Sequence, residues 1–336
     1  MRPLLRVSDL TVEFPTREGV IRPADGVTWE LEEGRTLVIL GESGSGKSVS
    51  TQAVGGILPY PGRVVGGRVE YKGEDLLTNR RLRQRLRGKE IAMVFQDPLS
   101  SLNPGLRVGG HIVEMFKVHG NISRAEAWQR AVELLDLVQI PDPEDRVQRY
   151  PHELSGGMRQ RVMLAIAVSQ QPSILIADEP TTALDATVQA QIIDTVRDLQ
   201  RNLGTAIVLI THDIGVAAAF ADDIAVMYGG RVVERGSATD VLRRPRHPYT
   251  EALLSSVPHV EGRRELAPIP GAPPRLHELP SGCAFHPRCQ YAKESCTRQV
   301  PELRPLAGGG RLVACDLSEQ LYAGVETAES AGGEHT

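Results

Sequence analysis

The stretch Gly41-Glu42-Ser43-Gly44-Ser45-Gly46-Lys47-Ser48 decides how the rest of the chain is organised. It has the form G-x-x-x-x-G-K-S, and it follows an apolar run at residues 36–40 that predicts a buried strand. A helix is expected to start at Ser48 and to continue to about Val54. A strand, a glycine-rich loop and a helix start, in this order, are the context in which such a stretch binds phosphate.

The chemistry of this loop follows from its backbone. Glycine has no Cβ, so the chain can turn sharply and bring its N–H groups close to phosphate oxygens. The start of the following helix adds unpaired N–H groups and a partial positive charge. We expect Lys47 to bridge the β- and γ-phosphates and the Ser48 hydroxyl to bind Mg²⁺. A flexible glycine turn without a ligand is the alternative, and the preceding strand disfavours it.

Length and composition limit the kind of protein. The 336 residues suffice for two domains, or for one large domain with an appendage. Hydrophobic residues make up 41% and charged residues 24%, as in soluble globular proteins. The net charge of −4 gives no general attraction to nucleic acid. No apolar run approaches the roughly 20 residues that span a bilayer, and residues 1–6 do not open a signal peptide, so we expect a cytoplasmic protein.

Polar residues follow three further apolar runs. The run at residues 91–95 ends at Gln96, the run at 173–177 ends at Asp178 and Glu179, and the run at 205–210 leads to His212. Ligands of parallel sheets bind at the carboxyl edge, where these side chains would meet. Asp178 is suited to hold Mg²⁺ through water, Glu179 to polarise an attacking water, and His212 to contact a γ-phosphate. A structural carboxylate pair and a structural histidine are the alternatives.

A second helix start is predicted at Leu154-Ser155-Gly156-Gly157. Ser155 is a natural N-cap, and the helix is expected to run from Met158 to Val168. A glycine-preceded helix N-terminus is a second candidate anion site. Taken alone it is weak evidence, because Ser-Gly-Gly also occurs in ordinary loops.

The remaining elements are predicted from periodicity. Alternation of apolar and polar residues at Leu10, Val12 and Phe14 predicts a strand. A loop is expected at residues 15–26, and the alternation at residues 27–31 predicts a second strand. Residues 55–67 look irregular, and residues 69–71 predict a short strand. The arginine-dense residues 79–89 favour a solvated helix over a contact with anionic lipid headgroups. Residues 99–150 look mainly helical, and residues 224–234 predict a β-hairpin.

In this order the motifs resemble the ATP-binding subunits of ABC transporters over about residues 4–257. In that family the stretch at 41–48 is the Walker A loop, Gln96 the Q-loop, and residues 154–157 the signature. Asp178 ends the Walker B strand, Ala183-Leu184-Asp185 is the D-loop, and His212 is the switch histidine. The resemblance implies an α/β fold: a RecA-like P-loop core with an antiparallel β subdomain and a helical subdomain at about residues 97–165.

Three further stretches look like importers of oligopeptides and dipeptides, and most like their D-type ATP-binding subunits. They are the pair of motifs at residues 95–98 and 101–104, the segment at 246–250, and the cysteine-containing tail from Gly282. The resemblance implies an ABC ATPase domain at residues 1–257 and a small C-terminal domain with four cysteines at 258–323. Residues 324–336 are small and polar and are expected to be a disordered tail. The close nickel importers share several of these features, so nickel stays an alternative substrate.

The resemblance also implies a role for each site residue. Glu179 is the expected general base, His212 the γ-phosphate sensor, and Gln96 a contact of the magnesium ion and the attacking water. Phe14 is expected to stack on adenine, with Arg17 and Ile21 as alternatives. Mg²⁺ is expected at Ser48, Gln96 and Asp178. The nucleotide contacts are expected from these residues: Phe14, Gly41, Glu42, Ser43, Gly44, Ser45, Gly46, Lys47, Ser48, Val49, Leu154, Ser155, Gly156, Gly157, Gln160 and Asp185.

Such subunits work in an assembly. ATP on one Walker A loop is covered by the signature helix of a second ATPase chain, so the resemblance implies a head-to-tail pair. We expect a heterodimer with a similar subunit, with a homodimer as the alternative. Two integral-membrane permease subunits would hold the pair at the cytoplasmic face of the membrane, and an extracytoplasmic solute-binding protein would act indirectly. No nucleic-acid partner is expected.

All four cysteines occur late, at Cys283, Cys289, Cys296 and Cys315. Gaps of five, six and eighteen residues do not match the short Cys-x₂₋₄-Cys pairs of most zinc sites. By resemblance to the dipeptide-importer subunits we expect a [4Fe–4S] cluster that staples the tail. Zinc and unliganded cysteines remain alternatives.

Other classes of ATPase fit less well. A soluble ABC ATPase of DNA repair would insert a long coiled coil between Gln96 and Ser155, where the chain has no room for one. Translation members carry two cores in one chain, and this chain has one. The segment at 246–250 and the cysteine tail argue against an exporter.

Overall fold

The computed structural model describes residues 2–120, 122–182, 184–256, 268–306 and 309–322. Its main sheet has the strand order β11-β12-β10-β9-β3-β8-β7-β6. At the centre β3 (Thr36–Leu40) pairs in parallel with β8 (Ala206–Thr211) and β9 (Asp223–Tyr228). Further out lie β7 (Ile174–Asp178) and β6 (Ile91–Val94), also parallel. The predicted apolar strands are thus confirmed, and their polar exits share one edge.

Both faces of this sheet are covered, which is why its strands read as continuous apolar runs. Val38 and Leu40 of β3 pack on one side with α7 (Gly156–Val168), α8 (Ala186–Leu203) and α9 (Ile214–Phe220). Leu37 and Ile39 point to the other side, where α1 (Lys47–Gly55) and the antiparallel sheet pack. The alternation of side chains along a strand therefore divides the core between two layers.

The antiparallel sheet has the order β2-β1-β4-β5. Its strands are β1 (Leu5–Thr16), β2 (Gly19–Leu31), β4 (Arg63–Tyr71) and β5 (Glu74–Asp75). The prediction of a loop at residues 15–26 is wrong, because β1 and β2 stay paired as far as Thr16 and Gly19. Only a tight turn separates the two strands. Likewise β4 begins at Arg63, before the expected strand. Pairing with β1 satisfies backbone groups of a stretch whose glycines and proline indicated irregular structure.

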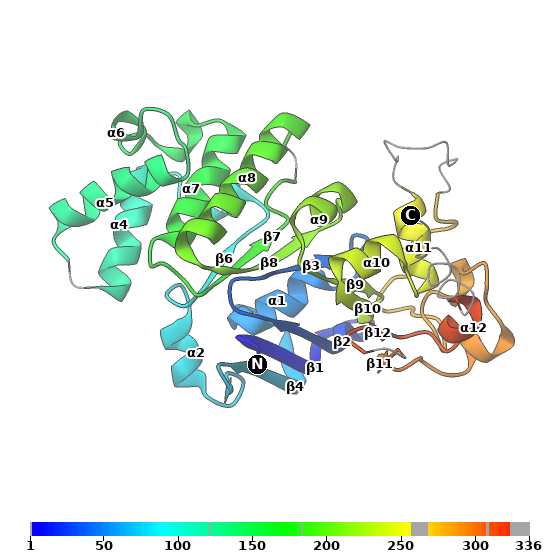
Figure 1. The fold of residues 1–336 in the computed structure, drawn as a ribbon. Helices are drawn as coiled ribbons and strands as arrows, with labels where there is room; N and C mark the ends of the chain where they lie inside the picture. Colours follow the sequence, from blue (N-terminus) through cyan, green and yellow to red (C-terminus); the bar gives the residue numbers. More distant parts are fainter. Residues whose placement is uncertain (1, 121, 183, 257–267, 307–308, 323–336) are drawn as a thin grey trace.

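Helices α3 (Pro98–Ser101), α4 (Val108–His119), α5 (Arg124–Leu137) and α6 (Pro143–Arg146) gather around α7 at one end of the molecule (Figure 1). A 3-10 turn, η1 (Pro151–Glu153), leads into α7. The mainly helical character expected for residues 99–150 is confirmed. The arginine-dense stretch also forms a short helix, α2 (Arg80–Leu86). In the described parts of the chain, no helix combines the length and apolar character that crossing a membrane requires.

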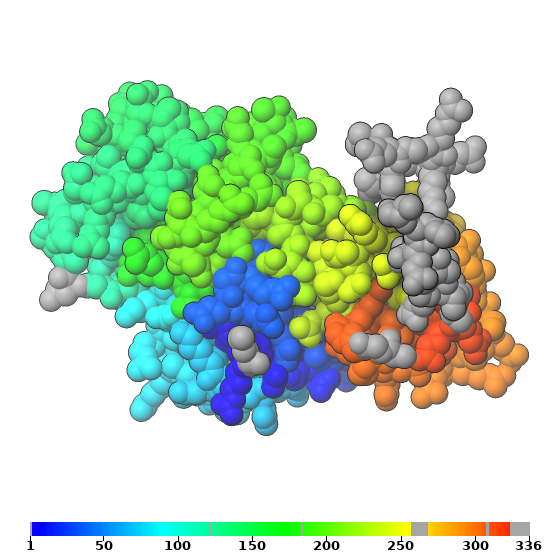
Figure 2. Space-filling view, in the orientation of Figure 1, coloured from blue at the N-terminus to red at the C-terminus, as the bar shows by residue number. Residues whose placement is uncertain are grey.

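The C-terminal segment (residues 268–306 and 309–322) lies at the opposite end from α4–α6 (Figure 2). The hairpin partner of β9 is β10 (Arg231–Ser237), and α10 (Ala238–Arg243) and α11 (Pro248–Ser255) follow it. The C-terminal segment contains η2 (His286–Arg288), η3 (Glu294–Thr297), β11 (Arg304–Pro305), β12 (Leu312–Val313) and α12 (Ser318–Tyr322).

This segment is joined closely to the ATPase core. Strand β12 pairs antiparallel with β10 and so extends the main sheet. Phe285 is 2% exposed and its ring contacts the rings of Tyr228 and Tyr249. A separate small C-terminal domain is therefore not confirmed. The boundary expected between residues 257 and 258 and the tail expected at 324–336 fall outside the described residues.

Candidate active site

The phosphate loop (residues 41–48) connects β3 to α1, as expected. Two of its glycines have no room for a side chain. Gly41 has φ +156° and a Cβ there would lie 2.3 Å from Met227 O, while Gly46 has φ +97° and a Cβ would lie 1.8 Å from Pro23 O. Gly46 is the N-cap of α1 and offers no side-chain acceptor. The first N–H groups of α1, from Lys47 through Val49, are therefore not capped by a side chain and can meet an anion.

Lys47 folds back over this loop. Its Nζ donates to Gly41 O at 2.8 Å and to Glu42 O at 2.9 Å, and it lies 3.9 Å from Glu179 Oε1. Burial lowers the pKa of Lys47, although the charges of Glu179, Asp178 and Glu42 oppose the shift. A triphosphate in the loop would add negative charge and favour the ammonium form.

Two of the three expected magnesium ligands, Ser48 and Asp178, lie in contact, whereas the third, Gln96, contacts Glu179. Ser48 Oγ donates to Asp178 Oδ1 at 2.8 Å, although the two residues are 130 positions apart. Asp178 is 4% exposed, and burial raises its pKa, with a lesser rise from Glu179. One hydroxyl and one carboxylate fit Mg²⁺, which keeps several waters and takes its other ligands from the phosphates. The residues present therefore fit this ion.

The candidate catalytic cluster (Gln96, Glu179, Thr182 and His212) is centred on one carboxylate oxygen of Glu179. Glu179 Oε2 accepts from Gln96 Nε2 at 3.1 Å and from Thr182 Oγ1 at 2.9 Å, and it lies 3.5 Å from His212 Nδ1. Glu179 has φ +45°, in the left-handed region that non-glycine residues rarely adopt. Such backbone strain collects at functional sites. The sequence placed three of these residues at strand exits and missed Thr182, which carries no signal of its own.

The signature residues form a second cluster. Ser155 caps α7 by accepting from Met158 N, as expected, and Leu154 is buried. A Cβ on Gly157 would lie 2.6 Å from Val188 Cγ1 of α8, so this glycine allows the two helices to pack. Asp185 caps α8 and Gln160 is buried, while Ala183 of the D-loop lies outside the described residues. Within the described ranges, no hydrogen bond joins residues 154–157 to the phosphate loop.

Phe14 contacts Gly62, outside the phosphate loop, whereas the C-terminal segment contacts Glu42 within it. The Phe14 ring lies against Gly62, where an added Cβ would be 2.4 Å from Phe14 Cζ, so its adenine contact stays a prediction. Two contacts to Glu42, from Arg288 and Tyr249, could not be predicted from the sequence. Arg288 Nη1 and Nη2 donate to the Glu42 carboxylate at 2.7 and 3.1 Å, and Glu42 N donates to Tyr249 Oη at 2.9 Å.

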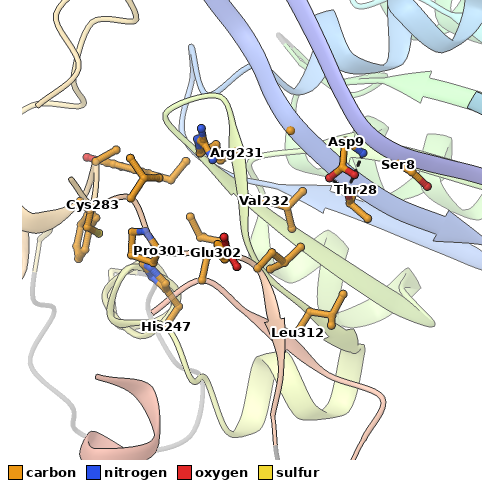
Figure 3. Close-up of a pocket in the computed structure, with 18 residues that line it drawn as sticks. Ser8, Asp9, Thr28, Arg231, Val232, His247, Cys283, Pro301, Glu302 and Leu312 are labelled. Carbon is orange, nitrogen blue, oxygen red and sulfur yellow. Dashed lines mark hydrogen bonds between the residues drawn. The ribbon is translucent and has the colours of Figure 1, made fainter. Parts of the chain in front are cut away.

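A cavity of about 490 Å³ lies between the antiparallel sheet, β10 and the C-terminal segment (Figure 3). Ser8, Asp9 and Thr28 line it from the antiparallel sheet, and Arg231 and Val232 line it from β10. The C-terminal segment closes it, through residues that include Cys283, Pro301, Glu302 and Leu312. Its lining contains no residue of the phosphate loop or the candidate catalytic cluster.

The four cysteines were expected to hold a metal. Burial raises the pKa of Cys283 and of Cys315 to about 11, and neighbouring thiols add to both shifts, which places the four sulfurs in one region. All four are free thiols. Among the described residues, however, no three histidine, cysteine, aspartate or glutamate side chains are arranged to hold a metal ion. Thiolates suit a cluster chemically, but this arrangement does not fit one, so the expected [4Fe–4S] and zinc sites receive no support.

Residues 24–182 match the family described as ABC transporter, and residues 233–296 match the oligopeptide/dipeptide transporter C-terminal region. The oligopeptide transport ATP-binding protein OppD of Bacillus subtilis is 50% identical over 304 residues, which cover 89% of this chain and 85% of that protein. The chain belongs to the ABC transporter ATP-binding proteins. Another member, the dipeptide transport ATP-binding protein DppD of Escherichia coli, is 47% identical over 308 residues, covering 91% of this chain and 94% of DppD.

Solved ABC structures agree with the fold. The cassette MJ0796, solved as a dimer, has a TM-score of 0.62 and 28% identity, and the match covers 70% of this chain and 98% of that one. For cbiO1 from Clostridium perfringens the TM-score is 0.61 and the sequence identity 29%, and the match covers 73% of this chain and 92% of cbiO1. The expected ABC cassette, with its α/β core, antiparallel sheet and helices, is confirmed. The chain is an ATPase of this transporter family, and the DNA-repair and translation alternatives are set aside.

Proposed function

We propose that this chain is the ATP-hydrolysing motor subunit of an importer of dipeptides or oligopeptides. The observation that carries the proposal is the match beyond the ATPase core. Residues 233–296 match the C-terminal region of oligopeptide/dipeptide transporters, and relatives named for peptide transport are 47–50% identical along most of their length. Nickel stays the alternative substrate, because nickel importers share several of the sequence motifs.

In the proposed reaction Glu179 takes a proton from the water that attacks the γ-phosphate. Thr182 and Gln96 both donate to Oε2, so they hold the carboxylate in one orientation. His212 lies against the same oxygen and would contact the γ-phosphate in this reaction. Lys47 supplies a positive charge beside the loop, and bound Mg²⁺ would neutralise phosphate oxygens next to Ser48 and Asp178. The roles of these residues are part of the proposal.

The proposed active site is completed by a second ATPase chain. The signature helix α7 begins directly after its N-cap Ser155, yet no hydrogen bond within the described ranges links residues 154–157 to the phosphate loop of the same chain. An opposing copy of such a helix would point its N-terminus at the γ-phosphate. MJ0796 was solved as a dimer, which is consistent with this arrangement. A similar subunit is the proposed partner, with a second copy of this chain as the alternative.

The proposed assembly includes two integral-membrane permease subunits. They would hold this chain at the cytoplasmic face of the membrane, and an extracytoplasmic solute-binding protein would deliver the substrate. The Q-loop and the helices that follow Gln96 are the proposed link between hydrolysis and the permease. Co-purification of the chain with integral-membrane subunits would support this assembly, and recovery of the chain without them from detergent-extracted membranes would count against it.

An iron–sulfur cluster stays a prediction that rests on family resemblance alone. The donor set of four cysteines supports it, whereas their arrangement does not. Elemental analysis of the purified chain tests it, together with the visible absorption of thiolate-bound iron. Iron with that absorption would support the cluster, zinc would favour the alternative, and a chain free of both metals would remove the idea.

Uptake in cells tests the substrate class. A strain that lacks this chain is supplied with the wild-type copy, and uptake of a radiolabelled dipeptide and of Ni²⁺ is measured separately. We expect the wild-type copy to restore dipeptide uptake, and unlabelled Ni²⁺ not to compete with it. Restoration of nickel uptake without dipeptide uptake would contradict the peptide proposal.

A further inference from the structure

Glu42 of the phosphate loop is held through all three of its polar groups. Its backbone N–H donates to Tyr249 Oη at 2.9 Å, and its carbonyl oxygen accepts from Lys47 Nζ at 2.9 Å. Its carboxylate forms a bidentate ion pair with Arg288, at 2.7 and 3.1 Å. The second residue of the loop therefore has fixed contacts to both the core and the C-terminal segment.

The side chain of Arg288 is buried and is held by several hydrogen bonds. Its side chain is 7% exposed, whereas that of Glu42 is 23% exposed. Besides Glu42 it donates to Pro270 O at 2.8 Å and to Tyr228 Oη at 3.2 Å. Burial opposes the charged guanidinium, but the contacts with Glu42 and Tyr228 raise the pKa of Arg288 above its ordinary value. A bidentate guanidinium–carboxylate pair fixes both partners in direction as well as in distance.

The segment that carries Arg288 is itself anchored. Arg288 is the last residue of η2, and η2 begins directly after Phe285, whose ring contacts the rings of Tyr228 and Tyr249. The segment continues to β12, which pairs with β10 in the main sheet. Arg288 and Glu42 are 246 positions apart, so the ion pair links the C-terminal segment directly to the loop.

We infer that Arg288 is a positioning residue for ATP binding, which acts through Glu42 on the phosphate loop. It fixes the first turn of the loop and neutralises a carboxylate that would otherwise repel the triphosphate. This inference deepens the ATP site and rests on ATP binding by the chain. Binding of ATP by the wild-type chain tests that basis, and the change caused by Arg288 variants tests the inference separately.

The test measures binding of fluorescent ATP and ADP analogues to the full chain with Mg²⁺. We expect Arg288→Met to raise the Kd for the ATP analogue about tenfold, as an uncompensated charge near phosphates predicts. The rise for ADP should be smaller, because ADP carries less negative charge. Adding Glu42→Gln to Arg288→Met should recover most of the loss, since no carboxylate then repels the nucleotide.

Arg298→Met is the matched control on the same segment. Arg298 also pairs with a glutamate, Glu294, but the two side chains are 71% and 81% exposed, so its Kd should stay within about twofold of wild type. Thermal unfolding of every variant separates loss of folding from loss of binding. If Arg288→Met does not fold, Arg288→Lys keeps the charge without the bidentate geometry and should raise the Kd about threefold.

Two results would overturn the inference. One is an Arg288→Met chain, or an Arg288→Lys chain where the first does not fold, whose ATP affinity equals that of wild type. The other is a double variant that binds as weakly as Arg288→Met, with equal losses for ATP and ADP. That pattern would show a purely structural role for Arg288.

Discussion

Glu179 is the residue on which the account of hydrolysis depends. Its carboxylate is oriented by two donors, and its backbone adopts a left-handed conformation directly after a buried strand. The sequence placed Glu179 at the strand exit because the apolar run before it is unmistakable. It could not reveal the backbone conformation or the Thr182 contact, since both depend on how the next turn folds back.

Replacing Glu179 by Gln keeps the shape of the side chain and removes its basicity. We predict that Glu179→Gln lowers the rate of phosphate release at least about 100-fold, in line with the loss of a general base. ATP binding should persist, because Lys47 and the loop backbone are unchanged. Phosphate release and nucleotide binding are measured on the same sample. Near-normal turnover in this variant would assign the proton transfer to another group.

At the scale of elements, α11 and the C-terminal segment meet around Glu234 of β10. Glu234 is fully buried and accepts from the backbone N–H groups of Arg246 and His247, both at 2.9 Å. It also pairs with Arg311, from the loop before β12. One buried carboxylate thus joins three parts of the chain.

Glu234→Ala should destabilise the fold strongly. It would leave Arg311 as a buried charge without its carboxylate partner and two N–H groups without acceptors, which costs about 3–5 kcal/mol. Urea unfolding measures the free energy of unfolding. Glu294→Ala, at an exposed ion pair, is the control and should change stability by no more than about 0.5 kcal/mol. Equal small changes in stability for both variants would show that the contacts of Glu234 do not hold the C-terminal segment on the core.

His247 makes stability depend on pH. It is the N-cap of α11, and burial lowers its pKa to about 3, from an ordinary value of 6.5. The folded chain keeps the imidazole neutral, whereas the unfolded chain protonates it below about pH 6.5. The contribution of His247 to the free energy of unfolding is therefore complete above that pH and is lost as the pH falls toward 3. At about pH 4.5 this residue alone lowers the free energy of unfolding by about 3 kcal/mol.

His247→Asn should flatten this dependence, because asparagine can cap the helix without titrating in this range. Urea unfolding of both chains at about pH 7 and about pH 4.5 isolates the contribution, since all other groups are shared. The wild-type chain should lose more stability between the two values than the variant does. Equal losses would mean that His247 is not held neutral in the folded chain.

The elements divide into those that local sequence determines and those that it does not. Strand β3 and helix α1 appear where apolar runs and the glycine loop predicted them, since fully buried parallel strands need continuous apolar residues. The cores of β1 and β2 were predicted, but strand β12 and the ends of β1 and β2 that pair across residues 15–26 were missed. Their short or polar stretches become strands only through pairing with distant partners, and this tertiary pairing overrides local preference.

At the scale of the whole molecule, the candidate catalytic cluster and the signature helix are two separate halves of a proposed composite site. Strand exits could be read from the sequence, but the contact between Arg288 and Glu42 could not, because 246 positions separate them and neither has a distinctive neighbour pattern. The C-terminal segment is therefore joined both to the main sheet, through β12, and to the phosphate loop, through Arg288.

ATP should bring two such chains together. We predict that Glu179→Gln, mixed with ATP and a similar subunit, forms a species of two chains in light scattering, because bound γ-phosphate completes the interface. The same mixture with ADP should remain monomeric, and so should a Lys47→Ala control with ATP. A mixture that stays monomeric with ATP, alone and with each candidate subunit, would contradict the composite site.

Peptide uptake into proteoliposomes tests the central claim most directly. The chain is reconstituted with the proposed partner ATPase and permease subunits, and the proposed solute-binding protein is supplied on the other side of the membrane. Uptake of a labelled dipeptide is then followed with and without ATP. We predict ATP-dependent uptake with the wild-type chain and a loss of at least about 100-fold with Glu179→Gln. Uptake that needs no ATP, or that survives Glu179→Gln unchanged, would contradict the account.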